Sequence, residues 1–366
     1  MGAHRTRIVH LDDGQDRRQA QNLRTGILLS DRDASLPFRD LFTSAWPEMR
    51  RVVVAFDQPG VAVVAIDTMK RRIAGSMCLA AKDGKANAAI VGRHGQCDLY
   101  LHGDPSLSLR HLVVLVHPRR DGEVCYRVLD LRTRSAFKDE AGRRLEAVTS
   151  EGPMFLQVGA YALYFLVTGD DQQLGWPEDA SQAWQCIPER VYLDEALAEP
   201  DRWGRRRRRG MPVLTAPEGA FAAGTGVGES LLPMARESIT LVRTQPGPAR
   251  ARIDAGDDDE PPMARLRLSS GGCSQALMLS SAAAHCGILL GRYERCDTHG
   301  ATVFAHHGIS RVHLLVVEID GDLYAIDTGS TNGTFQGEDE VRIARIGVGT
   351  ELVFGDDLAR MEWQPP

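Results

Sequence analysis

The feature that most constrains the fold is a series of short apolar segments separated by turn signals. Each segment is rich in β-branched and aromatic residues, which is typical of strands. The segments are VVVAF (52–56), VAVVAI (61–66), AAIVG (88–92), LVVLV (112–116), YRVLDL (126–131), FLQV (155–158) and YALYFLV (161–167). Turn signals such as Gln58-Pro59-Gly60 and Lys82-Asp83-Gly84 punctuate them. Many short strands at this spacing predict an antiparallel β-sandwich.

A second block of similar size follows near the C-terminus. Its expected strands are ARLRLSS (264–270), QALMLS (275–280), GILLG (287–291), HLLVVEID (313–320), LYAID (323–327) and ELVFG (351–355). Asp320-Gly321-Asp322 joins two of them and predicts a tight hairpin. A second sandwich is therefore expected.

The two blocks are separated by a segment of different composition. Residues 170–262 contain Pro breaks, the run Arg205–Arg209, a Gly/Ala/Thr stretch and the acidic segment Asp257–Glu260. A short helix is expected only around Glu189–Leu197. We predict a largely disordered linker here, and a partly disordered extension over residues 1–50 in which Phe38–Phe42 begins a short helix.

The two blocks carry the same landmarks in the same order, as divergent copies do. Gly92-Arg93 corresponds to Gly291-Arg292, and Cys97-Asp98 to Cys296-Asp297. A serine stands three residues before a histidine in both, as Ser108/His111 and Ser310/His313, and a later strand ends in Asp130 or Asp327. Shared order across these landmarks indicates an internal duplication.

Composition excludes several classes of protein. The chain has 366 residues, is 43% hydrophobic and has a net charge of −6, which disfavours a dedicated nucleic-acid binder. No apolar run is long enough to span a membrane, and the N-terminus lacks the apolar region of a secretory signal. The seven cysteines show no CxxC spacing, so we expect reduced thiols, a cytoplasmic location and no metal or other cofactor. Motifs of nucleotide-binding and hydrolytic enzymes are absent from the sequence, so no enzymatic activity is expected.

Three short motifs in the second block carry the functional signal. They are Gly291-Arg292, Ser310-Arg311-Val312-His313 and Ser330-Thr331-Asn332-Gly333-Thr334. All three are expected at turns, where arginine, hydroxyl and carboxamide groups can surround a doubly charged oxyanion. A phosphate ester on Ser or Thr carries about −1.5 to −2 charge and three acceptor oxygens, so these donors suit it well.

With these motifs the second block resembles the forkhead-associated (FHA) domain, a β-sandwich that binds phosphothreonine peptides. The resemblance covers about residues 263–364 and, more weakly, about residues 50–169. It implies an all-β protein in which two FHA-like β-sandwiches are joined by a long, largely disordered linker. The expected domains are an extension (1–50), a divergent FHA-like sandwich (51–169), the linker (170–262) and an FHA domain (263–366).

The resemblance also implies roles for individual residues. Arg292 and Ser310 would contact phosphate, Arg311 would join the cradle, Thr331 would also donate to phosphate, and Asn332 would hold the ligand's backbone. Gly291, His313 and Gly333 would shape and brace the loops. For His313 a buried hydrogen-bonding brace is the expected role rather than a ligand or acid–base group.

The first block departs from this pattern at the site. Leu109 stands in place of Arg311, and Ser135 and Ala136 stand where Asn332 and Gly333 stand, so the backbone clamp is missing. Arg110, Arg132 and Arg134 offer alternative anion contacts. We expect a divergent or structural fold here, used for partner binding or self-association.

The sequence therefore predicts a phosphothreonine-peptide-binding adaptor in Ser/Thr kinase signalling. Its partner would be a Thr-phosphorylated protein, with the chain's own linker threonines (Thr215, Thr225, Thr240 and Thr244) as further candidates. The alternatives are a scaffold or self-association protein whose FHA folds bind no phosphate, and a nucleic-acid or membrane-surface adaptor acting through Arg205–Arg209. Homo-oligomerisation is left open.

Overall fold

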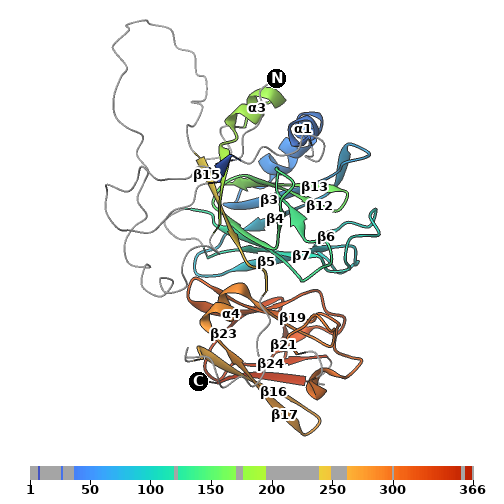
Figure 1. Ribbon diagram of the computed structural model, residues 1–366, viewed down its shortest axis with the longest axis vertical. Coiled ribbons are helices and arrows are strands. Elements are labelled where there is room, and N and C mark those ends of the chain that lie inside the picture. The colour runs from blue at the N-terminus through green and yellow to red at the C-terminus, as the bar shows by residue number, and fades with distance from the viewer. Residues whose placement is uncertain are drawn as a thin grey trace, which may run out of the picture.

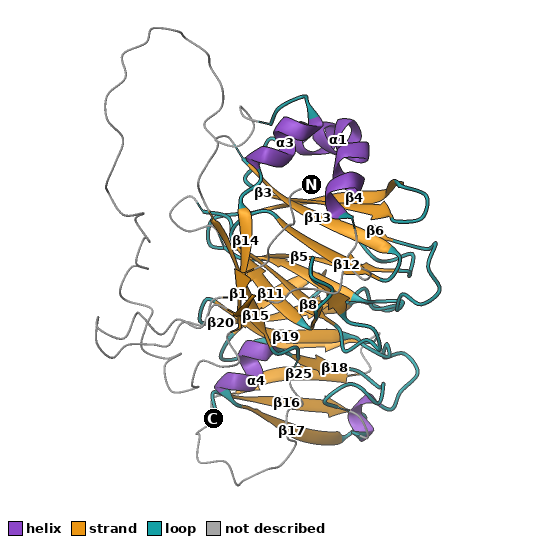
Figure 2. Ribbon diagram, turned by 45° about the horizontal axis from the view of Figure 1, so that its top comes forward, coloured by secondary structure: helices purple, strands orange, loops and turns teal. Residues whose placement is uncertain are grey.

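The computed structural model describes most of the two blocks and parts of the segments around them. The described residues are 7–8, 26–27, 37–118, 123–169, 176–194, 239–248, 262–298, 301–355 and 359–364. They form two β-sandwiches stacked on one another, with helices α1 and α3 on the outer face of the first (Figures 1 and 2). None of the described helices is long and apolar enough to cross a membrane.

The first sandwich has two sheets, one outer and one inner with respect to the whole molecule. The outer sheet runs in the order β10 (Arg144–Leu145), β9 (Phe137–Lys138), β12 (Met154–Val158), β13 (Tyr161–Thr168), β3 (Gly60–Asp67) and β4 (Arg72–Ala80). The inner sheet runs β2 (Gly26–Ile27), β1 (Arg7–Ile8), β14 (Glu189–Asp194), β15 (Ile239–Gln245), β11 (Ala147–Ser150), β8 (Tyr126–Asp130), β7 (Leu112–Val116), β5 (Asn87–Gly92) and β6 (Leu99–Tyr100).

The second sandwich is built in the same way. Its inner sheet runs β18 (Ile288–Leu290), β19 (Leu314–Ile319), β20 (Asp322–Asp327) and β23 (Ile343–Ile346). Its outer sheet runs β17 (Cys273–Leu279), β16 (Ala264–Ser270), β25 (Ala359–Gln364), β24 (Glu351–Phe354), β21 (Thr334–Gln336) and β22 (Asp339–Glu340). Helix α4 (Ser281–Cys286) precedes β18, and a 3₁₀ turn, η4, covers Thr302–Phe304. The Asp320-Gly321 hairpin forms as expected, with φ of 55° and 92° that match a type I′ turn.

Residues 52–56 were predicted as a strand, which is wrong. They end helix α1 (Phe38–Ala55), which is far longer than the short helix expected at its start. Its buried side chains, such as Leu41, Phe42, Ala45, Trp46 and Met49, recur at helical spacing and pack on the outer sheet. Val53, in the β-branched run at the end of the helix, lies on the same buried face. Packing of this face on the sheet therefore outweighs the preference of valine for strands.

Parts of the predicted linker belong to the first sandwich. Glu189–Asp194 forms strand β14 rather than the expected helix, and it pairs in parallel with β15 in the inner sheet. Helix α3 (Ala180–Cys186) packs against α1, and Asp179 caps it by accepting a hydrogen bond from the amide of Gln182. Strand β15 buries alternate residues, which is the pattern of a half-buried strand. The strand is short and lies among polar residues, so the sequence did not predict it. Arg205–Arg209 and Asp257–Glu260 lie outside the described residues.

Both faces of the central strands are buried, which explains their continuous apolar runs. In β7, Leu112, Val114 and Val116 pack into the core of the first sandwich. The alternate residues Val113 and Leu115 face the second sandwich. The core of the second sandwich is a separate cluster that includes Leu314 and Val316.

The two sandwiches meet through their inner sheets in one apolar interface. The residues buried there come from equivalent positions of the two blocks: Ile90 and Leu289, Cys97 and Cys296, Val113 and Leu315, Leu115 and Val317, Leu129 and Ile326. This correspondence makes the interface pseudo-twofold, like that of a symmetric dimer inside one chain. A shared buried surface also means that the two sandwiches form one packed unit, which the sequence did not predict.

Candidate functional site

The candidate site lies where three loops leave the inner sheet of the second sandwich. The first loop follows β18 and carries Gly291 and Arg292, the second precedes β19 and carries Ser310, Arg311 and His313, and the third joins β20 to β21 and carries Thr331, Asn332 and Gly333. Strands β18, β19 and β20 are antiparallel neighbours, so the three loops lie together at one end of the sheet.

A close backbone approach joins the first two loops. The amide of Arg292 donates to the carbonyl of Ser310 at 3.4 Å, and the amide of Tyr293 to that of Arg311 at 2.9 Å. A Cβ on Gly291 would lie 2.4 Å from the Arg311 carbonyl oxygen, so only glycine fits. Gly92 in the first block has the same constraint, with a Cβ position 2.3 Å from the carbonyl oxygen of Leu109.

The second and third loops meet through hydroxyl groups. The Oγ of Ser310 accepts from the amide of Thr331 at 3.0 Å and lies 3.5 Å from the Thr331 Oγ1. The Nδ2 of Asn332 donates to the carbonyl of Gly308 at 3.0 Å. Thr331 and Asn332 are exposed, whereas Ser310 is largely buried.

Arg292 and Arg311 supply the positive charge of the site. Both side chains are exposed. The Nε of Arg292 donates to the carbonyl of Ile309 at 2.8 Å, which directs this guanidinium to the residue before Ser310. Arg311 follows Ser310 directly, and its carbonyl also accepts from the thiol of Cys296 at 3.2 Å. The loops thus bring the backbones of the predicted donors together, and both guanidinium groups are exposed.

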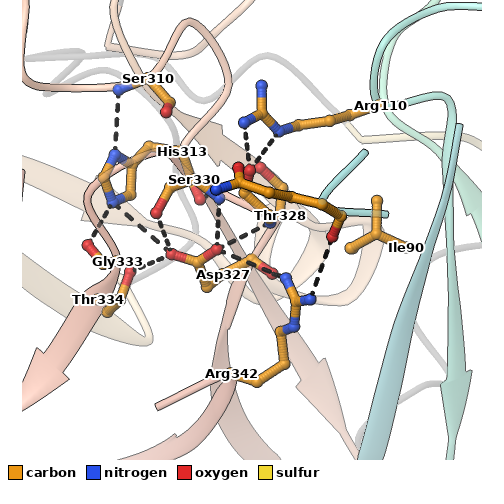
Figure 3. Close-up of polar contacts among 12 residues, drawn as sticks. Ile90, Arg110, Ser310, His313, Asp327, Thr328, Ser330, Gly333, Thr334 and Arg342 are labelled. Atoms are coloured by element: carbon orange, nitrogen blue, oxygen red, sulfur yellow. Dashed lines mark hydrogen bonds and ion pairs between the residues drawn. The ribbon is translucent and has the colours of Figure 1, made fainter. Parts of the chain in front are cut away.

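His313 is fully buried and braces two loops, as the sequence predicts. Its Nδ1 accepts from the amide of Ser310 at 3.2 Å, so Nε2 carries the proton and donates to the carbonyl of Gly333 at 3.1 Å (Figure 3). Burial lowers the pKa of His313, which keeps the ring neutral and preserves this arrangement.

Asp327 organises the third loop, although it was not among the predicted site residues. Its Oδ1 accepts from the amides of Gly329 and Ser330 at 2.8 and 2.7 Å. Its Oδ2 accepts from the hydroxyls of Ser330 and Thr334 at 2.5 and 2.7 Å (Figure 3). The strand-ending aspartate at the same place in both blocks was the sequence signal for this role.

The first sandwich repeats this framework with a shorter loop. Thr133 donates to Asp130 through its amide at 2.7 Å and its hydroxyl at 2.5 Å, as Ser330 does to Asp327. His111 is buried, and its Nε2 donates to the carbonyl of Ser135 at 3.2 Å. This carbonyl lies one residue nearer the aspartate than in the second block, so Ser135 takes the place of Gly333 and not that of Asn332. The predicted equivalence is wrong by one residue: the loop is one residue shorter, and Arg134 stands where the second block has Thr331 and Asn332.

Two arginines offered as alternative anion contacts in the first block serve the interface instead. Arg132 donates to the carbonyl of Arg295 at 2.6 Å and pairs with Asp297 at 2.9 Å. Arg110 donates through Nε to the carbonyl of Gly329 at 2.9 Å. Both side chains are thus occupied by the second sandwich.

Comparison with protein-family models decides the identity of the second sandwich. Residues 288–355 match the model of the FHA domain. These residues form an FHA domain. It contains all three candidate loops.

Solved structures of FHA domains are among those similar to part of the chain. Mycobacterium tuberculosis Rv1747 FHA-1 is 28% identical over 28% of this chain and 98% of its own, with a TM-score of 0.23. A structure of Mycobacterium tuberculosis EmbR with a low-affinity phosphopeptide is 20% identical over 28% of this chain and 24% of its own, with a TM-score of 0.22. The FHA domain of Chlamydia trachomatis CT664 is 20% identical over 30% of this chain and 97% of its own, with a TM-score of 0.23. No protein of curated function matches the sequence.

Metal binding gains no support from the described residues. Among them, no group of three or more His, Cys, Asp or Glu side chains is placed to hold an ion. The predicted phosphate contacts are two arginines and two hydroxyls, which suit an oxyanion better than a metal.

Proposed function

We propose that the FHA domain of this chain reads phosphothreonine peptides and that the chain acts as an adaptor. The observation that carries the proposal is the contact between Ser310 and Thr331, flanked by the exposed guanidinium groups of Arg292 and Arg311. Hydroxyl, amide and guanidinium donors together suit a dianionic phosphate better than any neutral ligand.

The donor set is sufficient for a useful affinity. A well-aligned hydrogen bond to a charged group contributes about 1.5–3 kcal/mol. After the entropy lost on ordering the peptide is subtracted, two arginines and two hydroxyls support a binding free energy of about −8 kcal/mol, which is a micromolar dissociation constant. Arg292, Arg311 and Thr331 are exposed, so a phosphate can reach them without the opening of a buried site.

Asn332 is placed to hold the peptide backbone next to the phosphate. One of its N–H groups donates to Gly308 and fixes the side chain. A carboxamide has a second N–H and an acceptor oxygen, and with these it can bind an amide and a carbonyl of an extended peptide.

The partner in this proposal is a Thr-phosphorylated protein of a Ser/Thr kinase pathway, in the cytoplasm. The chain's own threonines are weaker candidates than the sequence indicated. Thr240 and Thr244 lie in β15 and are each 5% exposed, so a kinase could not reach them in this fold. Thr215 and Thr225 lie outside the described residues.

The test is binding of a peptide pool with a fixed central phosphothreonine and randomised flanks to the full chain. Fluorescence polarisation should detect micromolar binding that is lost with unphosphorylated threonine and reduced at least tenfold by Arg292→Ala. Arg360→Ala is the matched control, because Arg360 is an exposed arginine of the outer sheet, paired with Glu351 at 2.8 Å. Equal binding by Arg292→Ala and wild type would place the ligand elsewhere.

A structural role is the second candidate, and the interface favours it for the first sandwich. That sandwich buries its inner sheet against the FHA domain and has no asparagine in the loop after Asp130. We propose that it extends from β1 to β15 and acts as a partner domain rather than as a second reader. A peptide that binds with a stoichiometry of one and loses all binding in Arg292→Ala supports this assignment, whereas two bound peptides per chain would contradict it.

A further inference from the structure

One side chain of the first sandwich reaches the loop that carries Thr331 and Asn332. The Nε and one terminal nitrogen of Arg110 both donate to the carbonyl of Gly329, with the Nε–oxygen distance at 2.9 Å (Figure 3). Arg110 belongs to the first sandwich and Gly329 to the second, so this contact crosses the interface.

Asp327 binds the amide of Gly329, but the carbonyl of Gly329 is bound from the other sandwich. The carboxylate of Asp327 binds the amides of Gly329 and Ser330 from inside the FHA domain. The carbonyl of Gly329 points the opposite way, because in a trans peptide it lies opposite the Ser330 N–H that binds Asp327, and there it accepts from Arg110. The loop is thus held between a carboxylate of its own domain and a guanidinium of the neighbouring one.

The held segment ends at the phosphate donors. Thr331 follows Gly329 by two residues, and its amide is fixed on the Oγ of Ser310. Movement of the Gly329 peptide would therefore displace Thr331 relative to Ser310. Preorganised donors bind more tightly than mobile ones, because less conformational entropy is lost on binding.

Packing alone does not require an arginine at this position. The equivalent residue of the FHA domain is Val312, whose side chain packs partly buried against the apolar interface. An apolar residue therefore satisfies the interface, whereas Arg110 adds a directed pair of donors and a charge. Burial lowers the pKa of Arg110, whereas the negative charges of Cys97 and Asp327 raise it and the positive charges of Arg311 and Arg342 lower it.

Arg342 makes a second ionic contact between the base of this loop and the first sandwich. Its guanidinium lies 3.7 Å from the Asp327 carboxylate (Figure 3). It also lies 3.4 Å from Asp98 of the first sandwich. The loop base is therefore part of an ionic network that spans both sandwiches.

We propose that the first sandwich sets the affinity of the phosphothreonine site by holding the β20–β21 loop through Arg110. Arg110 is a positioning residue that touches no ligand. The inference rests on the proposed reader function of the FHA domain and adds to it that the divergent copy is a built-in regulator of the site. Any partner that loosens the interface would weaken peptide binding without touching the pocket.

The test compares Arg110→Met with Arg127→Met in the full chain. Methionine keeps the apolar stem of arginine and removes the donors. Arg127 also reaches across the interface, where it donates to the carbonyl of His285 at 2.7 Å, at the opposite end of β18 from Arg292. With the best phosphothreonine peptide of the pool, Arg110→Met should lose about tenfold in affinity, as expected for lost charge-assisted bonds, and Arg127→Met less than twofold.

Hydrogen exchange of the amides from 329 to 331 gives a second readout. Exchange there should rise in Arg110→Met and stay at the wild-type rate in Arg127→Met, and Arg110→Lys should fall between Met and wild type in both measurements. Unchanged affinity and unchanged exchange in Arg110→Met would overturn the inference and leave the reader function standing. Absence of any peptide binding by the wild type would instead overturn the reader function, and this inference with it.

Discussion

Arg132 and Gly329 occupy the same position in the two aspartate-led loops, and both have positive φ, 52° and 79°. The carbonyl of each accepts a hydrogen bond from an arginine of the opposite sandwich: Arg295 donates to Arg132 at 2.7 Å and Arg110 to Gly329 at 2.9 Å. The pseudo-twofold interface is therefore polar at its rim and apolar at its centre. Its two ends use arginines from different positions of the repeat, so the symmetry is approximate.

Removal of the Arg132 side chain should destabilise the folded chain strongly. Arg132 pairs at 2.9 Å with Asp297, whose side chain has no exposed surface. Arg132→Met leaves this carboxylate buried without its cation, which costs about 3–5 kcal/mol. Urea unfolding measures the loss. Arg345→Ala is the control, because its pair with Asp322 is exposed and should contribute less than about 1 kcal/mol.

Truncation inside the interface should destabilise both sandwiches together. Leu315 is fully buried between the inner sheets, so Leu315→Ala should cost about 2–5 kcal/mol. Calorimetry should show one transition at a lower temperature in the variant, because the sandwiches share this core. Val348→Ala, at a side chain that is 75% exposed, should leave the transition unchanged. Two separated transitions in the wild type would contradict a shared core.

Gly291→Ala should disrupt the site through the backbone. Its Cβ would lie 2.4 Å from the carbonyl oxygen of Arg311, so the first two loops must separate. Peptide affinity should fall at least tenfold, with a stability loss of about 1–3 kcal/mol. Gly347→Ala is the matched control, because a Cβ there meets no atom within 4 Å. Wild-type affinity in Gly291→Ala would show that the loops tolerate this separation.

The neutral form of His111 should make stability depend on pH. Burial lowers its pKa from 6.5 to about 4, so the folded chain binds fewer protons here than the unfolded chain. The contribution is complete above pH 6.5 and is lost as the pH falls to about 4, a loss of about 3 kcal/mol at 1.36 kcal/mol per unit.

Asp130 opposes this effect, since burial raises its pKa from 3.8 to about 6 and stabilises the fold at low pH. A comparison with His111→Gln separates the two contributions, because both proteins keep Asp130. The difference in unfolding free energy between wild type and His111→Gln should shrink by about 3 kcal/mol from pH 7 to pH 4. A constant difference over this range would show that His111 does not titrate in the fold.

Peptide binding should also depend on the loop carboxylate. Asp327→Asn keeps the shape of the side chain but replaces one acceptor oxygen with a donor, which faces the donors of Ser330 and Thr334 or of Gly329. We expect a stability loss of about 2–3 kcal/mol and weaker phosphothreonine binding. Urea unfolding and fluorescence polarisation check both effects, and unchanged peptide affinity would show that the loop does not depend on Asp327.

The sequence by itself determined the chemistry of the candidate site and the existence of two β blocks. Ser310, Thr331 and Asn332 follow strands whose apolar runs are unambiguous, so loops that carry them had to fall at the ends of a sheet. The buried brace at His313 could also be expected, because the second block resembles the FHA domain at this position.

Only the tertiary structure decided how the two blocks act on one another. The run LVVLV in β7 indicates that both faces of the strand are buried, but no local pattern predicts which part of the chain covers the second face. The same limit hid helix α1, whose last turn is β-branched, and strand β15, whose partner β14 is distant in sequence. Long-range packing set these outcomes, and it placed Arg110 of a divergent copy on the loop of the complete one.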